Sequence, residues 1–509
     1  MDNSDTTGVQ SLTRSRVEAQ DSAVELIVHV RNILPVLLFC LLASLFSQQA
    51  SFAQEAKKEA PAKAAETQPA VNPADNPGGE VAKAATALPA AAAQPVPLSD
   101  RLRSLFGVVL ILGVCYAFSS NRKIISRRIV FWGLTLQWIM AYLVLSNPYG
   151  QNALKWTGSQ IEKVLACSYK GSEFLFGAEA INPAGKIGFV FAFRVLPTVI
   201  FMSALFAVLY YLKVMPFIVA RMAWVMKRLL GVSGAESLAA AANVFLGQTE
   251  APLTIRPFLN KLTQSELLVV MATGMASVSG GMMGAYFAYG IASQHILTAV
   301  MMTAPGCIMI CKMLVPETEE PETLGYLHHE ALNLDTNLLD AASRGTREGL
   351  DLALNIGAML ISFISLITLL NLLLGGIGEG INGSFSTNMN LSLQSILGFI
   401  LAPFAWLMGV PWAESAEFGS LLGTRTIVNE LIAYDGLAKL KTTFHPRTFA
   451  MASFALCGFA NLSSIGIQLG GIGAIVPERR KDLAKMGLKA MVAGSLANYM
   501  SACIAGILL

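Results

Sequence analysis

The sequence feature that most constrains the fold is a short polar stretch, Gly-Gln-Thr-Glu-Ala-Pro at residues 247–252, inside an apolar segment that spans residues 239–258. A carboxylate at bilayer depth costs roughly 3 kcal/mol, so Glu250 is expected to face a protein cavity and to mark a function. Gly247 and Pro252 interrupt a helix on either side of it. Interrupted backbone is tolerated at membrane depth only where it is buried in protein or lines water.

Basic residues stand at both ends of this segment, which predicts a hairpin that enters the membrane and returns to the cytoplasmic side. Residues 248–250 would form its tip. The simpler alternative is a buried helix cap in which Glu250 is satisfied locally.

Composition indicates a polytopic α-helical membrane protein. Of the 509 residues, 54% are hydrophobic and only 14% are charged, whereas soluble proteins carry about 25% charged residues. The net charge of +3 is too small to argue for a nucleic-acid partner. The seven cysteines lie mostly in apolar runs and fit small packing residues better than a disulfide framework or a metal site.

The first hundred residues differ from the rest. An apolar run at residues 33–46, followed by a small-x-small pattern at 51–53, predicts a signal peptide over residues 1–53. An uncleaved N-terminal anchor is the alternative, because the leader before the apolar run is long. Residues 54–100 are rich in Ala, Pro, Glu and Lys and predict a disordered linker, periplasmic if the signal works.

From residue 101 onwards the hydropathy pattern predicts eight membrane spans. They cover residues 105–119, 129–146, 187–212, 267–291, 295–314, 352–374, 449–475 and 487–508. Polar, Gly- and Ser-containing sequence interrupts the fourth and seventh. Residues 156–176 and 216–230 are amphipathic and are expected at the membrane surface, and residues 393–410 are expected to lie on the outer side.

An internal repeat supports this layout. Gly-Val-Ser-Gly-Ala-Glu-Ser at residues 231–237 recurs as Gly-Val-Pro-Trp-Ala-Glu-Ser at 409–415. Each copy precedes a hairpin that carries a glutamate, then a broken span and an intact span; the second hairpin covers residues 413–441. Three spans separate the hairpins, so the second enters from the opposite side. Inverted repeats with interrupted helices are typical of secondary transporters.

Three motifs carry a family resemblance: residues 247–252, Val-Asn-Glu at 428–430, and Phe-Ala-Leu-Cys-Gly-Phe-Ala-Asn-Leu-Ser-Ser at 454–464. Over residues 101–509 the chain resembles the concentrative nucleoside transporters, the bacterial nucleoside:cation symporters. The resemblance implies an all-α polytopic fold of eight transmembrane helices and two re-entrant hairpins. It also implies a homotrimer in the inner membrane that imports nucleosides by elevator-type alternating access, and not an enzyme.

The resemblance divides the chain into a scaffold and a moving transport domain. The expected parts are N-terminal scaffold and interfacial helices at 101–230, the first hairpin repeat at 231–315, a cytoplasmic loop at 316–350, a scaffold helix with a connecting segment at 351–408, and the second hairpin repeat at 409–509.

Candidate sugar-binding residues follow from the chemistry of a nucleoside. An ionised Glu430 can accept hydrogen bonds from two neighbouring ribose hydroxyls, and such charge-assisted bonds are the stronger kind. Asn461 and Ser464, three residues apart in the broken seventh span, could complete the sugar pocket. The alternatives are that Glu430 ties the second hairpin together and that Asn461 caps a helix.

By resemblance, Gln248, Thr249 and Glu250 face the base and Phe459 packs against it, although Phe459 could equally be ordinary helix packing. Met282 stands where a smaller aliphatic residue often lines the base pocket of the family, which leaves the preferred base open.

The coupling ion needs oxygen ligands if it is sodium, as other hard cations do. Asn243 and Ser277 supply side-chain oxygens where the family's sodium site has them, and the carbonyls of Leu246 and Val278 would be free where the backbone unwinds. Sodium is favoured over protons on this match. Glu250 is the proton acceptor if protons drive transport.

Other functions remain open on the residues alone. A proton-driven carrier of another hydroxylated solute would share this architecture. A channel would line a continuous pore with polar rings, whereas the polar residues here concentrate in two hairpins and two helix breaks. An intramembrane enzyme would need a metal set or a histidine near Ser277 or Ser464 in sequence, and neither is found there.

Overall fold

The computed structural model describes residues 96–182, 190–324, 335–385 and 391–509. The expected signal peptide, and the expected linker up to residue 95, lie outside the described residues. Residues 98–100, at the end of that linker, already belong to the first described helix.

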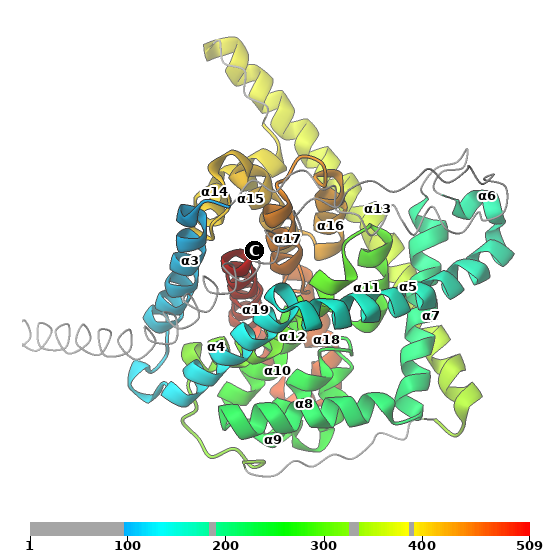
Figure 1. The fold of residues 1–509 in the computed structure, drawn as a ribbon, viewed down its shortest axis with the longest axis vertical. Helices are drawn as coiled ribbons and strands as arrows, with labels where there is room; N and C mark the ends of the chain where they lie inside the picture. Colours follow the sequence, from blue (N-terminus) through cyan, green and yellow to red (C-terminus); the bar gives the residue numbers. More distant parts are fainter. Residues whose placement is uncertain (1–95, 183–189, 325–334, 386–390) are drawn as a thin grey trace, which may run out of the picture. The chain divides into compact units, whose positions relative to one another are not determined.

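The described residues form helices and connecting turns, with no strand among them (Figure 1). In chain order the elements are α3 (Leu98–Ala117), η1 (Arg122–Ile124), α4 (Arg127–Ala141), η2 (Tyr142–Ser146), α5 (Pro148–Phe176), α6 (Ala178–Ile181), α7 (Phe191–Tyr211), α8 (Val214–Leu230), α9 (Gly234–Ala242), η3 (Ala251–Lys261), α10 (Gln264–Ala276), α11 (Gly280–Ala288), α12 (Ser293–Leu314), α13 (Leu338–Phe385), α14 (Leu393–Leu407), α15 (Trp412–Ile427), α16 (Glu430–Lys439), α17 (Pro446–Ala455), α18 (Leu462–Ile475), η4 (Pro477–Arg479) and α19 (Arg480–Leu508).

Six helical segments of the described chain are long and apolar enough to cross a membrane, or seven if the bent pair α14 and α15 counts as one. The predicted count of eight is therefore supported only coarsely. The first expected span is helix α3, but Asp100, Arg101 and Arg103 occupy its first turns and shorten its apolar part. The seventh expected span consists of two short helices, α17 and α18.

The interior of the bundle is formed by α10, α12 and α19, which pack against one another. The apolar stretch of α10 and α11 that could span a membrane is wholly buried. Of the corresponding stretch of α13, none of the described residues is buried. α13 packs along α7. A helix that is apolar and yet exposed is expected to face lipid or another subunit.

At both expected helix breaks, and at the turn of the second hairpin, a polar residue caps the next helix. Ser279 accepts a hydrogen bond from the backbone of Met282 at the start of α11. Asn429 accepts from Ile432 at the start of α16. Asn461 caps α18 in the same way. A side-chain oxygen at this position satisfies a backbone N–H that the helix itself leaves unpaired. The polar residues in these apolar segments therefore begin new helices.

The first expected hairpin consists of α9, a non-helical turn and η3, and α9 packs against η3. The second consists of α15 and α16, which pack against each other and are joined by Val428 and Asn429. Helix α14, expected as a separate helix on the outer side, packs closely on α15 and makes an angle of 118° with it.

Candidate functional site

Two interrupted helices meet at the centre of the described structure. The break between α10 and α11 lies against the break between α17 and α18, where the backbone N–H of Phe459 donates to the carbonyl of Ser277 (3.3 Å). A Cβ on Gly458 would lie 2.5 Å from the carbonyl oxygen of Ala276. Since real Cβ atoms do not approach an oxygen so closely, only glycine permits this contact.

One asparagine on α19 joins the two breaks. The side-chain amide of Asn498 donates to the carbonyl of Ala276 (2.8 Å) and to that of Cys457 (2.6 Å). Its side-chain oxygen accepts from the guanidinium of Arg425 on α15, which also donates to the carbonyl of Gly458 (3.2 Å). Asn498 and Arg425 are both fully buried. We refer to these two side chains as the Arg425–Asn498 clip.

This clip was not predicted from the sequence. The signal was present, because Arg425 is a cation inside the second apolar hairpin and such a residue is as costly at membrane depth as Glu250. Asn498 gave a weaker sequence signal, since a single amide in an apolar span does not indicate which residues it will bond.

Four of the predicted substrate-binding residues share one buried hydrogen-bonded network. Gln248 donates to the hydroxyl of Ser464 (3.2 Å), whose backbone N–H donates to the side chain of Asn461 (2.9 Å). The amide of Asn461 donates to one carboxylate oxygen of Glu430 (3.3 Å), and the hydroxyl of Tyr286 donates to the other (3.2 Å). The tip of the first hairpin is thus connected to the start of α18 and to the second hairpin.

Two further residues support this network. Gln468 on α18 donates to the side chain of Gln248 (3.3 Å) and to the carbonyl of Met271 (2.9 Å), and it is fully buried. A Cβ on Gly471 would lie 2.3 Å from the methyl group of Thr249, so Thr249 packs directly over that glycine. Gln468 was not predicted, although an amide in the otherwise apolar α18 could have indicated it.

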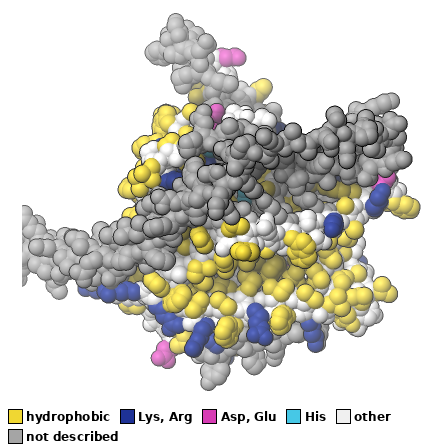
Figure 2. All heavy atoms as spheres, in the orientation of Figure 1, with side chains coloured by type: hydrophobic (Ala, Val, Ile, Leu, Met, Phe, Trp, Pro, Cys, Tyr) yellow, Lys and Arg dark blue, Asp and Glu magenta, His cyan; other side chains and the backbone are white. Residues whose placement is uncertain are grey.

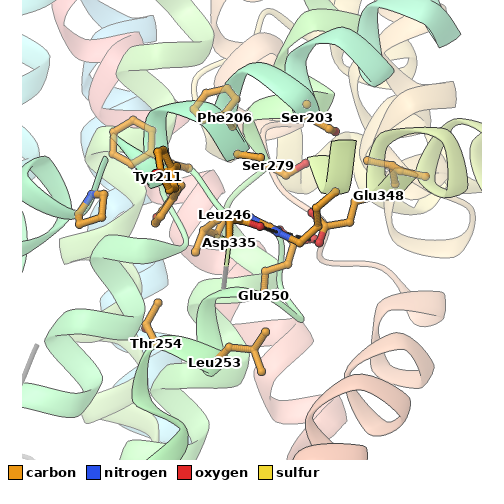
Figure 3. Close-up of a pocket in the computed structure, with 18 of the residues that line it drawn as sticks. Ser203, Phe206, Tyr211, Leu246, Glu250, Leu253, Thr254, Ser279, Asp335 and Glu348 are labelled. Carbon is orange, nitrogen blue, oxygen red and sulfur yellow. Dashed lines mark hydrogen bonds and ion pairs between the residues drawn. The ribbon is translucent and has the colours of Figure 1, made fainter. Parts of the chain in front are cut away.

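Glu250 lies in a different environment from Glu430. It accepts a hydrogen bond from the backbone of Gly247 (2.7 Å) and lines a cavity of about 210 Å³. Glu430 is not among the residues that line this cavity. The cavity lies between the first hairpin, α7, α8, the start of α11 and the start of α13 (Figure 3).

Charged side chains from the first turns of α13 and from the segment just before it form one wall of this cavity. Arg344 makes two hydrogen bonds to Asp335 (2.7 and 2.9 Å) and one to Glu348 (2.8 Å). Both carboxylates line the same cavity as Glu250, as does Tyr210 of α7. Glu250 therefore shares a cavity with charged groups at and just before the start of α13, whereas Gln248 is hydrogen-bonded to Ser464.

The two remaining base-pocket candidates lie near the helix breaks. Met282 is buried in the first turn of α11, next to Gly281, which lines the cavity. Phe459 is half-buried within the break between α17 and α18.

The four residues predicted to hold sodium lie around the break between α10 and α11 and the end of α9. The side-chain oxygen of Asn243 is buried and has no hydrogen-bond partner among the described residues. Its amide nitrogen donates to the hydroxyl of Thr273 (3.1 Å). The hydroxyl of Ser277 donates to the carbonyl of Thr273 (2.7 Å), and Val278 is fully buried. Leu246 lines the cavity beside Glu250. An unpaired buried amide oxygen fits a cation, because an oxygen buried without a partner otherwise costs about 1–3 kcal/mol.

Three segments of the chain match families of known proteins. Residues 106–179 match the N-terminal part, and residues 295–506 the C-terminal part, of the Na⁺ dependent nucleoside transporters. Residues 192–293, between them, match a family described as nucleoside recognition.

Curated relatives cover the same region. The chain is 40% identical over 413 residues to the uncharacterized transporter YutK of Bacillus subtilis, an alignment that covers 80% of this chain and 99% of the relative. It is 37% identical over 425 residues to solute carrier family 28 member 3 of Mus musculus, covering 80% of this chain and 59% of the mouse protein.

Solved structures of similar fold match about the same share of the chain. An inward-facing, substrate-bound structure of CNTnw is 41% identical, with a TM-score of 0.75, and covers 80% of this chain and 98% of that one. A doubly substituted CNTnw in an outward-facing state is 40% identical, with a TM-score of 0.77, covering 81% of this chain and 99% of that one.

Proposed function

The chain belongs to the family of Na⁺-dependent nucleoside transporters, and we propose that it is a secondary active importer of nucleosides driven by inward sodium flow. Like its relatives it is a transporter and not an enzyme. We place it in a bacterial inner membrane with its N-terminal extension in the periplasm, as the basic residues of the loop at 121–128 favour.

The observation that carries the proposal is the buried network from Gln248 through Ser464 and Asn461 to Glu430. A nucleoside is uncharged and presents hydroxyls on one end and base donors and acceptors on the other. Glu430 would accept from the ribose hydroxyls, with Asn461 and Ser464 beside it, and Gln248 would bond the base. A solute that lacks these groups would leave the buried polar groups unpaired, which is the physical basis of strong rejection.

In this proposal Thr249, Glu250, Met282 and Phe459 enclose the base. The placement of Glu250 in the cavity beside α7 and α13 supports a role at the outer end of the base, away from the sugar-binding carboxylate. Base preference would then depend on Met282, which lies next to that cavity.

Sodium would bind at Asn243 and Ser277 with the carbonyls of Leu246 and Val278. The unpaired buried oxygen of Asn243 supports this assignment, since sodium takes oxygen ligands. Inward movement of one positive charge at 100 mV provides about 2.3 kcal/mol, and at about 1.4 kcal/mol per tenfold this supports roughly 40- to 50-fold accumulation.

The movement would be of the elevator type within a homotrimer. The buried block of α10, α12 and α19, together with the two hairpins, would carry the site across the membrane. Helices α7 and α13, which pack along each other, would belong to the stationary scaffold. The cavity between Glu250 and the start of α13 lies between these two proposed parts.

Proton coupling is the second candidate, because Glu250 lines a cavity together with an arginine and two other carboxylates. Replacing sodium by choline at fixed pH, in proteoliposomes offered several labelled nucleosides, separates the two. Sodium coupling predicts that uptake stops without sodium at every pH, whereas uptake that persists and follows the pH gradient would establish proton coupling instead. If none of the nucleosides is taken up under either gradient, the carrier moves another hydroxylated solute.

A further inference from the structure

Helix α8 runs along one boundary of the membrane-spanning bundle. It follows directly on α7, a candidate span that ends at Tyr211. Its last turn is held by Arg128, at the start of the candidate span formed by α4 and η2. The guanidinium of Arg128 donates to the carbonyls of Leu229 (2.9 Å) and Arg228 (2.6 Å). Since both ends of α8 are attached to ends of spans, the helix lies where the spans leave the bilayer.

The side chains of α8 fit such a position. Phe217 and Trp224 are more than half exposed, which is unfavourable in water but typical of a membrane interface. Arg221 and Arg228 are also exposed on this helix. Figure 2 shows Lys and Arg side chains in a row beneath a broad band of hydrophobic side chains. Basic residues beside exposed aromatic rings favour contact with lipid headgroups.

A pocket of about 450 Å³ opens at this end of α8. It is lined by Arg128, Trp224, Lys227, Arg228, Gly231, Val232 and Leu324. None of these lining residues of the described chain carries a carboxylate, in contrast to the cavity at Glu250, which contains three.

Arg128, one of the residues that line this pocket, is held by its two hydrogen bonds to the end of α8. Gly231 has φ +74° and a Cβ there would lie 3.1 Å from the guanidinium of Arg128, so the turn leaves room for the arginine to pack against the backbone. A preorganised guanidinium is well suited to a phosphate, because little side-chain entropy is lost on binding.

We propose that this pocket, between the start of α4 and the end of α8, binds the phosphate headgroup of an anionic phospholipid. Its charge selects an anion, and its position at the bilayer boundary with Trp224 exposed selects a ligand whose acyl chains stay in the membrane. None of the residues that line this pocket is assigned to nucleoside or sodium, so the proposal does not depend on the proposed transport function.

Trp224 provides the measurement. The full chain is reconstituted in phosphatidylcholine vesicles that contain brominated phosphatidylglycerol or, separately, brominated phosphatidylcholine at the same fraction. The Trp224 signal is obtained by subtracting the fluorescence of Trp224→Phe. We expect quenching to favour phosphatidylglycerol about fivefold per pocket charge, which corresponds to about 1 kcal/mol for each basic residue at the surface.

Matched variants identify the pocket. Arg228→Gln should lose about fivefold of the preference, and Arg228→Lys should keep it. Arg221→Gln removes the same charge from the same helix outside the pocket and should leave the preference unchanged. Arg128 is not altered, because its guanidinium also caps α8.

Three results would overturn the proposal. Equal quenching by the two lipids would mean that the pocket does not select an anionic headgroup. An equal loss in Arg221→Gln would mean that diffuse surface charge causes the preference. Displacement of phosphatidylglycerol by inorganic phosphate at constant ionic strength would show that the pocket takes free phosphate and not a lipid.

Discussion

Arg425 at the end of α15 donates a hydrogen bond to the side-chain oxygen of Asn498 on α19, and neither side chain is exposed. Through this bond the second hairpin is attached to both helix breaks at once, since Asn498 also holds the carbonyls of Ala276 and Cys457. The relative position of the two breaks, and hence of the proposed nucleoside and sodium sites, depends on this clip.

The clip can be tested by truncating its asparagine. In Asn498→Ala, Arg425 loses a charged hydrogen bond and two carbonyls lose their donor, so we expect a loss of at least about 2 kcal/mol of stability and a raised KM for nucleoside. Thermal unfolding in detergent measures the loss of stability, and nucleoside uptake in proteoliposomes measures the KM. Thr303→Val is the matched control. It removes the weaker bond from Asn498 to Thr303 (3.3 Å) and the bond from Thr303 to the carbonyl of Ala299 in its own helix (2.7 Å), but it leaves the clip intact. Equal effects of the two variants would contradict the role of the clip.

Glu430→Gln should abolish concentrative uridine uptake while the protein remains in the membrane. The substitution keeps the size of the side chain but removes the charge that strengthens hydrogen bonds from the sugar hydroxyls, each worth about 1.5–3 kcal/mol. Glu417→Gln, an exposed carboxylate on α15, is the control and should transport normally. Normal uptake by Glu430→Gln would remove Glu430 from the site.

Asn243→Leu should raise the sodium concentration needed for half-maximal uptake at least about tenfold, equivalent to about 1.4 kcal/mol. The variant removes the buried oxygen that has no partner among the described residues. Asn243→Asp retains a side-chain oxygen and should retain sodium-dependent uptake. Sodium titration of uptake at fixed pH and saturating nucleoside is the measurement, and an unchanged sodium response in Asn243→Leu would place the ion elsewhere.

Gly458→Ala should destabilise the protein by about 1–3 kcal/mol through overpacking, because its Cβ would lie 2.5 Å from the carbonyl oxygen of Ala276 and 2.7 Å from Asn498. Gly466→Ala and Gly470→Ala on neighbouring α18 meet nothing within 4 Å. These controls should leave the melting temperature unchanged or raise it, since alanine favours a helix over glycine. A Gly458→Ala protein as stable as the controls would show that the breaks can separate without cost.

Local chemistry was sufficient to predict the role of Asn461 at its helix end. Asn461 was considered both as a helix cap and as a ligand, and it caps α18 while donating to Glu430. By resemblance, Glu250 was expected at the base and Glu430 at the sugar of one nucleoside site. In the structure the network joins Gln248 to Ser464, and the residues that line the cavity at Glu250 do not include Glu430. Residues two positions apart at a turn can face opposite sides, and the sequence does not say which side each takes.

The sequence alone determined the class of protein, the family and the location of the helix breaks, because a carboxylate, an amide or a glycine in an apolar segment is costly and must have a local structural reason. Only the tertiary structure decided which polar groups meet. Arg425, Asn498, Tyr286 and Gln468 lie on different helices, and their hydrogen bonds depend on how those helices pack against one another. Such hydrogen bonds form between residues far apart in the chain, so no local sequence pattern predicts them.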